Sequence, residues 1–291
     1  MATTTKIEWC DATFNPWIGC TPLGPPCDHC YARVSTPVRA MHIEWGQGKP
    51  RHRTSEATWK QPVIWERQHE QFFKEHGHRR RVFCASLADV FDNEVDPQWR
   101  ADLWALIRQT PHLIWMLLTK RVGNVPSMLP PDWPHIVAGG YRHAGYPNVM
   151  IGITVADRAE AIRDLPKLYR FGARWKFISY EPALGPLDVE YPEEIWPDGP
   201  PMCCSGYDCG CRGMPVDPPL IHGVDLLIAG GESGTDARPA ELQWFRSLRD
   251  QCKAARVPFF MKQLGGVRDK RGNLEDLPED LRIREFPEIS A

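Results

Sequence analysis

Short apolar runs recur along this chain, and most are followed by polar or glycine residues and then by a helical pattern. They cover residues 81–87, 113–118, 149–155, 175–179, 224–229 and 257–261. Continuous apolar runs of this length are typical of strands that are buried on both faces of a parallel sheet. Residues 97–109, 156–171 and 240–255 carry apolar side chains at helical spacing. With a first strand near Ile18, this alternation predicts an α/β fold with a parallel βα barrel, partial or complete.

Polar side chains gather at or just past the carboxyl ends of these apolar runs. They are Ser86, Asp89, Lys120, Arg121, Thr154, Glu181, Glu232, Lys262 and Gln263. The carboxyl ends of the strands in a βα barrel share one face, and that face carries the active site. We therefore expect these side chains to lie on one functional face.

Three cysteines follow the first expected strand, namely Cys20, Cys27 and Cys30. Three thiolates can hold three irons of a [4Fe–4S] cluster and leave the fourth iron open to a ligand. The same spacing also suits zinc, with His29 or Cys10 as a fourth ligand, although Cys10 lies in a strand-like run. Because the loop opens on the face with the polar residues, the pattern favours the iron–sulfur interpretation.

A second group of cysteines lies in a Pro/Gly-rich segment, residues 190–219, that does not fit the strand–helix repeat. It contains Cys203, Cys204, Cys209 and Cys211. Four cysteines in so short a span suit zinc or an auxiliary cluster, but adjacent Cys203 and Cys204 make tetrahedral coordination awkward, and His222 is close enough to replace one of them. A metal-stabilised insertion is favoured over a metal-free loop with reactive thiols.

Composition limits the class of protein. The 291 residues carry ten cysteines and a formal net charge of −2, so the chain as a whole does not attract nucleic acid. No apolar stretch is long enough for a membrane span, and no apolar signal segment precedes the first cysteines. These features predict a soluble protein of a reducing cytoplasm. We expect a single domain over residues 1–291, with a C-terminal tail at 266–291.

Local positive charge remains in two stretches. One is residues 76–81, and the other is residues 33–53, which lie beside Trp45 and Trp59. Basic residues interleaved with aromatics suit a nucleic-acid groove. Solvated loops have the same composition, so both interpretations stay open.

Sequence blocks in the same order carry a family resemblance. The chain opens with Lys6-Ile7-Glu8-Trp9-Cys10-Asp11-Ala12-Thr13-Phe14-Asn15-Pro16, and the later blocks are Gly19-Cys20, Cys27-Asp28-His29-Cys30-Tyr31-Ala32, Leu118-Thr119-Lys120-Arg121, Ser179-Tyr180-Glu181-Pro182, Gly230-Gly231-Glu232-Ser233-Gly234 and Pro258-Phe259-Phe260-Met261-Lys262-Gln263. The chain resembles the radical S-adenosylmethionine superfamily, and more closely a phage- and bacteria-associated family of radical-SAM-like proteins. The superfamily loop is usually Cys-x3-Cys-x2-Cys, and the closer family shares the longer first gap of this chain. A looser likeness is to spore photoproduct lyase, a thymine-repair radical enzyme.

This resemblance implies a barrel of radical-SAM type and a chemistry carried by its cofactors. Cys20, Cys27 and Cys30 would bind a [4Fe–4S] cluster, and S-adenosylmethionine would chelate its open iron and yield a 5′-deoxyadenosyl radical that abstracts hydrogen from the substrate. The residues expected to bind the cofactor are Ser86 and Asp89 near its amino group, Lys120 or Arg121 near its carboxylate, Glu181 at its ribose, and Thr154.

Other residues are expected to act on the substrate. Glu232 and Lys262 are placed for substrate, while Cys84 and Tyr180 could relay a hydrogen atom to a product radical. The alternatives are a structural ion pair for the strand-end Lys and Glu residues, and a small buried apolar side chain for Cys84.

The resemblance also gives an expectation for substrate and partners. The expected reaction is isomerisation or rearrangement of a modified thymine in phage DNA, with flavodoxin or ferredoxin as the reductant, in the cytoplasm of a bacterial or phage-infected cell. Radical modification of tRNA or a peptide is a second hypothesis. A zinc protein that binds nucleic acid without catalysis is a third, from a different class.

Overall fold

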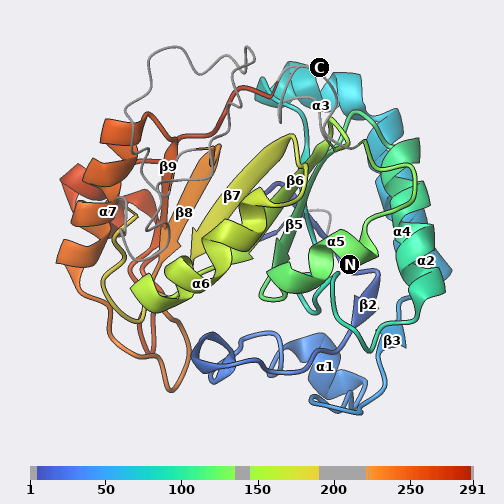
Figure 1. The fold of residues 1–291 in the computed structure, drawn as a ribbon, viewed down its shortest axis with the longest axis horizontal. Helices are drawn as coiled ribbons and strands as arrows, with labels where there is room; N and C mark the ends of the chain where they lie inside the picture. Colours follow the sequence, from blue (N-terminus) through green and yellow to red (C-terminus); the bar gives the residue numbers. More distant parts are fainter. Residues whose placement is uncertain (1–4, 135–144, 190–220, 222, 290–291) are drawn as a thin grey trace. The chain divides into compact units, whose positions relative to one another are not determined.

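The computed structural model describes residues 5–134, 145–189, 221 and 223–289 (Figure 1). The chain divides into two compact units. Unit 1 comprises residues 1–133, 146–154 and 289–291, and unit 2 comprises residues 134–145 and 155–288. The earlier expectation of a single domain stays a prediction.

Four parallel strands form the centre of unit 1. They are β1 (Ala12–Phe14), β4 (Arg81–Cys84), β5 (Ile114–Thr119) and β6 (Val149–Thr154). They pair in the order β1-β4-β5-β6, with Phe14 opposite Cys84 and Thr119 opposite Ile153. Every residue of β6 is buried, as are all but one in β5, because helices and loops cover both faces of a parallel sheet.

The helices of unit 1 are α1 (Thr36–Ala40), α2 (Glu56–Arg67), α3 (His69–His76), α4 (Pro97–Gln109) and α5 (Val125–Met128). Short 3₁₀ turns are η1 (Pro25–Cys27) and η2 (Val122–Asn124). Helix α4 begins where the sequence indicated, because Asp96 accepts a hydrogen bond from the Gln98 amide at 2.8 Å and Pro97 occupies the first helical position. Figure 1 shows α2 and α4 side by side.

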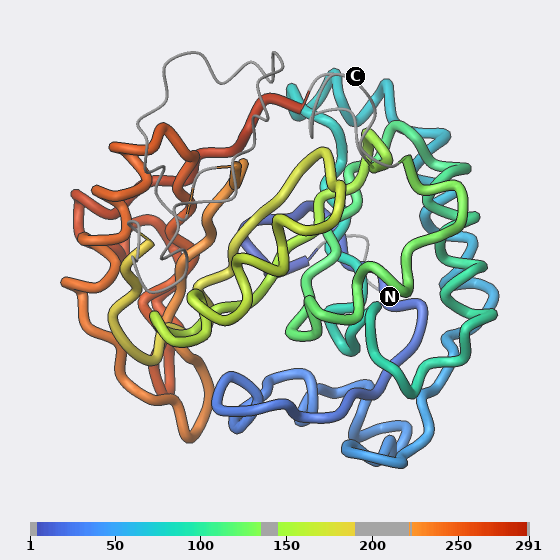
Figure 2. The backbone as a smooth tube through the Cα atoms, viewed as in Figure 1, coloured from blue at the N-terminus to red at the C-terminus, as the bar shows by residue number. Residues whose placement is uncertain are grey.

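Between the two strands of a small antiparallel ribbon, the chain is almost all loop. The ribbon pairs β2 (Trp17–Ile18) with β3 (His52–Arg53). Figure 2 shows the path of residues 19–51, which leave β2, pass through η1 and α1, and return to β3. The expectation that Ile18 belongs to the first strand of the parallel sheet is therefore wrong. That strand is β1, which ends four residues earlier, and Ile18 pairs with His52 instead.

Unit 2 has three parallel strands in the order β7-β8-β9. They are β7 (Trp175–Tyr180), β8 (Leu226–Gly230) and β9 (Phe259–Gln263), with helices α6 (Arg158–Tyr169) and α7 (Leu242–Ala255) and 3₁₀ turns η4 (Leu274–Asp276) and η5 (Glu279–Leu281). Helix α7 packs against β9. It buries Phe245, Leu248 and Cys252, the helical spacing that predicted it.

The prediction of an α/β fold built on parallel strands is confirmed. Each of the six apolar runs coincides with one of the strands β4 to β9, and the three expected helices are α4, α6 and α7. Residues 266–288, expected as a tail, pack along β9: the Met261 amide donates to Ile283 at 2.8 Å, and Leu281 is fully buried. No helix in the described part of the chain is long and apolar enough to cross a membrane.

Candidate active site

Backbone hydrogen bonds hold the cysteine loop of unit 1, both to Leu87 and within the loop itself. The Gly19 amide donates to the Leu87 carbonyl at 3.1 Å. Gly19 has a φ of +115°, and a Cβ there would lie 3.2 Å from Cδ of Arg51, so only glycine fits comfortably. Two successive turns follow, in which the Cys27 amide donates to Gly24 at 2.8 Å and the Cys30 amide donates to Cys27 at 3.3 Å.

All three cysteines of this loop are free thiols of intermediate exposure. Among the described residues, they do not form a set of ligand atoms within 4.8 Å of one another. A single tetrahedral ion needs its ligands about 2.0–2.3 Å from one centre, whereas a four-iron cluster holds each thiolate on a different iron. The loop is therefore more open than a zinc knuckle.

Arg121, just past the carboxyl end of β5, reaches the cysteine loop. Its Nη1 donates to Sγ of Cys20 at 3.4 Å, and its Nη2 donates to the Thr21 carbonyl at 2.7 Å. Its side chain is only 8% exposed. A guanidinium in contact with a thiol favours the thiolate, the form that binds metal. The end of β5 and the cysteine loop thus meet at Cys20.

Asp89 holds Arg121 in place. One carboxylate oxygen accepts from the Phe91 amide at 2.9 Å, and the Thr119 hydroxyl donates to both oxygens at 2.9 and 3.0 Å. The other oxygen accepts from the Lys120 amide at 3.1 Å and from Arg121 at 3.3 Å. These contacts make Asp89 the residue that positions Arg121, and its expected contact with a cofactor amino group stays a prediction.

These contacts set the protonation of Cys20. Burial, followed by the charge of Asp89, raises the pKa of the Cys20 thiol to about 12, although Arg121 opposes the shift. In the metal-free protein Cys20 should therefore be protonated at pH 8, and an alkylating reagent should label it slowly, with a rate that rises as the pH approaches 12. Mass spectrometry of iodoacetamide-treated protein across this range measures the rate. Labelling of Cys20 that is already complete at pH 8 would contradict the prediction.

Arg51 anchors the cysteine loop from its other end. Its Nε donates to Asp92 at 2.8 Å, its Nη2 to the Thr21 hydroxyl at 2.8 Å, and its Nη1 to the Lys49 carbonyl at 2.8 Å. Glu94 accepts a further bond at 2.5 Å. Sequence reasoning counted Arg51 as part of a basic stretch, but its side chain is 1% exposed and paired. The closely spaced acidic residues Asp89, Asp92 and Glu94 were the sequence feature that could have indicated paired arginines, since they pair with Arg51 and Arg121.

The basic stretch at residues 76–81 also makes contacts within the protein. Arg79 donates to the His112 carbonyl at 3.1 Å, the Arg80 guanidinium lies 4.0 Å from the ring centroid of Phe72, and His78 is paired with Asp11 at 3.2 Å. These contacts weaken the expectation of a nucleic-acid groove at residues 76–81.

Two polar groups at the ends of β5 and β6 have no partner in the described residues. The Lys120 ammonium forms no hydrogen bond or ion pair there, and the buried hydroxyl oxygen of Thr154 has no hydrogen-bond partner. Because Thr119 pairs with Ile153, both residues come at the same end of neighbouring strands. Ser86 is partnered, since its hydroxyl accepts from Asn15 at 3.1 Å.

Unit 2 carries a separate polar group at the carboxyl ends of its strands. Glu181 and Lys262 form an ion pair, which matches the alternative of a structural pair. The backbone is tight here, because a Cβ on Gly231 would lie 2.1 Å from the Leu264 carbonyl oxygen. Gln263 donates to the Gly231 carbonyl at 2.9 Å.

The remaining predicted catalytic residues are enclosed. Glu232 makes a bidentate pair with Arg238 at 2.7 and 2.9 Å. Cys84 is fully buried, and burial raises the pKa of its thiol. Tyr180 is also fully buried and donates to the Gly185 carbonyl. The second cysteine group, Cys203, Cys204, Cys209 and Cys211, and also His222, lie outside the described residues.

Unit 1 is therefore an α/β unit with a parallel sheet. At the carboxyl end of this sheet, the loop that carries three thiols contacts the buried ion pair of Asp89 and Arg121. The chain belongs to the family described as "Protein of unknown function (DUF5131)", whose model matches residues 4–282. No curated protein matches the sequence. Among solved structures, an ABC transporter system solute-binding protein from Conexibacter woesei is 12% identical over 94% of this chain and 74% of that chain. Its TM-score of 0.15 is too low to support any argument.

Proposed function

We propose that this protein is a radical S-adenosylmethionine enzyme that carries a [4Fe–4S] cluster on Cys20, Cys27 and Cys30. The observation that carries the proposal is the contact of Arg121 with both the Cys20 thiol and Asp89, at the carboxyl end of β5. In parallel α/β proteins this end of the strands is the catalytic face. A loop with no catalytic task has little reason to hold three free thiols there.

The donor set fits both groups. Three free thiols on one loop suit an iron–sulfur cluster with one open iron. The ammonium of Lys120 and the orphaned hydroxyl of Thr154 suit the carboxylate and other polar groups of a methionine moiety, since a buried polar atom without a partner costs free energy until a ligand supplies one. When bound, the cluster and S-adenosylmethionine together supply reductive cleavage of a sulfonium and a carbon radical.

The residues of this chain hold and tune these groups. Asp89 holds the Arg121 guanidinium in place, and that guanidinium puts its positive charge next to the sulfur of Cys20. Lys120 stands next in the chain and offers its ammonium to a carboxylate. Cys20 is only partly exposed, which reduces the access of water and oxygen to its sulfur. Of the six residues first expected at the cofactor, Lys120 and Thr154 have side-chain groups without a partner among the described residues.

We further propose that the substrate is a nucleobase, specifically a modified thymine in phage DNA that the enzyme rearranges. The cysteine loop supports this choice because it exposes apolar and cationic side chains together. The exposed apolar side chains are Tyr31, Val34 and Met41, and Arg33 and Arg39 are exposed between them. Aromatic and cationic groups combined in this way suit single-stranded or flipped-out bases.

The test is anaerobic reconstitution with iron and sulfide, followed by incubation with a reductant and S-adenosylmethionine labelled at its 5′ carbon with deuterium. A brown protein that forms 5′-deoxyadenosine supports the class of enzyme, and label exchange into phage DNA supports the substrate. A colourless protein that binds zinc contradicts both proposals. A brown, cofactor-cleaving protein with no exchange into any base or nucleotide contradicts only the substrate.

Replacing Arg121 with methionine should lower the reduction potential of the cluster. Loss of a positive charge and of a hydrogen bond to a cluster thiolate disfavours the added electron. A tenfold change in the one-electron equilibrium corresponds to about 59 mV, and we expect a shift of that order. Redox titration followed by EPR measures it. Lys120→Met is the matched control, because Lys120 does not contact the cysteines, and an unchanged potential in Arg121→Met would contradict the assigned contact.

A further inference from the structure

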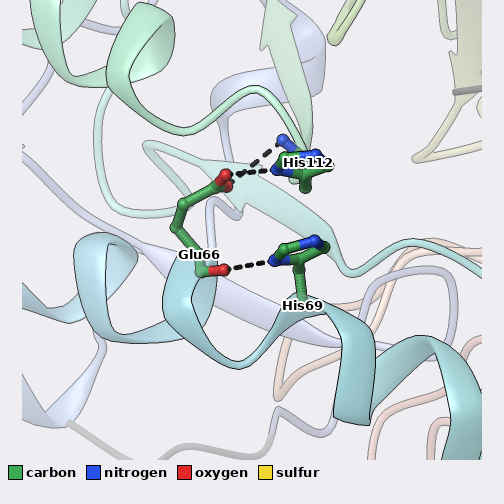
Figure 3. A group of neighbouring side chains, drawn as sticks. All are labelled: Glu66, His69 and His112. Atoms are coloured by element: carbon green, nitrogen blue, oxygen red, sulfur yellow. Dashed lines mark hydrogen bonds and ion pairs between the residues drawn. The ribbon is translucent and has the colours of Figure 1, made fainter.

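A second group of metal-ligating side chains lies in unit 1, away from the cysteine loop. Glu66 belongs to the last turn of α2, His69 begins α3, and His112 lies in the loop before β5. One ligand atom from each residue falls within 4.8 Å of the others. Figure 3 shows the two imidazole rings above one another, each with a nitrogen turned toward Glu66.

Hydrogen bonds to Glu66 set the tautomer of both rings. Nδ1 of His112 lies 2.5 Å from Oε1 of Glu66, and the His112 amide donates to Oε2 of the same carboxylate at 3.2 Å. Nδ1 of His69 lies 2.8 Å from the Glu66 backbone carbonyl. A carbonyl or carboxylate oxygen can only accept, so Nδ1 is the donor in both neutral rings and Nε2 keeps its lone pair. Metal-binding histidines show this arrangement, with Nδ1–H given to a carboxylate or carbonyl and Nε2 on the metal.

The rings also stand close enough to share an ion. Their centroids are 3.8 Å apart, and their planes differ by only 14°. Figure 3 shows the second nitrogen of each ring on the side away from Glu66. The His112 side chain is 49% exposed, so it can turn to converge on an ion, and solvent gives the ion its entry path.

We propose that His69 and His112 bind a borderline divalent transition-metal ion such as Zn²⁺ through their Nε2 atoms, with Glu66 as the residue that orients both rings. Imidazole suits zinc, copper and nickel rather than magnesium or calcium. Waters complete the coordination, because the protein supplies two ligands.

The place of this site in the fold indicates a stabilising role. His112 precedes β5 and Arg121 follows it, and the six residues of β5 separate the two ends by about 20 Å. The ion would join α3 to the loop at the amino end of the strand, opposite the face with the cysteines. An ion that binds only the folded protein raises its stability by mass action. We therefore expect no part for it in catalysis.

The experiment is a Co²⁺ titration of the full-length protein, followed by visible absorbance, with Zn²⁺ competition. Ligation by imidazole and water gives weak d–d bands, whereas the cysteine loop would add an intense sulfur-to-cobalt charge-transfer band. We expect d–d bands that reach one equivalent in the wild-type protein, with any sulfur-to-cobalt band coming from the cysteines. His69→Ala and His112→Ala should each weaken its affinity at least about tenfold, and Glu66→Gln should weaken it less than either. His76→Ala, on the same helix α3, is the matched control.

A second measurement, the thermal midpoint with and without Zn²⁺, distinguishes loss of the metal site from misfolding of a variant. Zn²⁺ should raise the thermal midpoint of the wild-type and His76→Ala proteins, and the rise should disappear in His69→Ala and His112→Ala, whose midpoints without metal report whether they fold. Equal d–d bands in all variants, or a rise of the thermal midpoint that persists in His69→Ala and His112→Ala, would overturn the proposal. Neither result bears on the iron–sulfur proposal, because the group of Glu66, His69 and His112 contains no cysteine.

Discussion

Replacing Cys27 with alanine should abolish the iron–sulfur cluster while leaving the protein folded. Cys27 ends the short η1 turn and has intermediate exposure, so its side chain contributes little to the core. Without its thiolate only two of the three iron ligands remain, and two cysteines do not retain a [4Fe–4S] cluster with an open iron. Iron content and absorbance near 400 nm after anaerobic reconstitution measure the loss, which we expect to exceed about tenfold.

The control for this variant is Cys10→Ala, which also discriminates between metals. Cys10 is buried at 8% exposure, and it was the cysteine that could complete a zinc site with the loop. If the loop holds iron, Cys10→Ala keeps the full iron content. A protein that loses its metal equally in both variants, and whose metal is zinc, would refute the cluster. Circular dichroism shows whether each variant retains its fold.

Replacing Arg51 with methionine should destabilise unit 1 by about 3–5 kcal/mol, because it removes the nearest cation from a buried carboxylate, which Arg121 approaches only to 3.8 Å. Arg51 and Asp92 are 1% and 2% exposed at their side chains and lie 2.7 Å apart. The variant also loses the bonds from Arg51 to Thr21 and to the carbonyls of Gly46 and Lys49. These bonds join the two ends of the cysteine loop, so a reconstituted variant should also hold less iron.

Lys49→Met is the matched control for Arg51→Met, because the two residues belong to the same loop. Lys49 pairs with Glu44 at 3.0 Å, but the two side chains are 44% and 64% exposed. An exposed pair of this kind contributes about 0–1 kcal/mol. Urea unfolding followed by tryptophan fluorescence compares the two variants. Equal free energies of unfolding would show that Arg51 does not anchor the loop.

Much of the fold could be predicted because its signal is local. Helix α4 was placed at its observed limits, since Asp96 and Pro97 mark its start and apolar residues follow at helical spacing. Strands β5 and β6 were continuous apolar runs that only a buried sheet accommodates. Helices α2 and α3 escaped prediction because their buried residues are few: Pro62 and Trp65 in α2, and Phe72 alone in α3. Their helical form depends on packing rather than on a strong apolar stripe.

The candidate site was only partly visible in the sequence. Cys20, Cys27, Cys30 and the residues at strand ends could be named, because cysteine spacing and strand limits are both read along the chain. The sequence did not show which of these side chains are already hydrogen-bonded or ion-paired within the protein and which remain available for a ligand. Asp89 proved to be occupied by Thr119 and Arg121, and Glu232 by Arg238, which left Lys120 and Thr154 with groups to offer.

The sequence by itself determined six of the strands, three of the helices and the position of the cysteine loop before them, because hydrophobic periodicity and turn residues act over a few positions. The tertiary structure decided which charges are buried and paired. Arg121 meets Cys20 across 101 positions and Arg51 meets Asp92 across 41. Such pairs depend on the low dielectric and fixed geometry of the folded interior, and neither exists until the strands and the loop have come together.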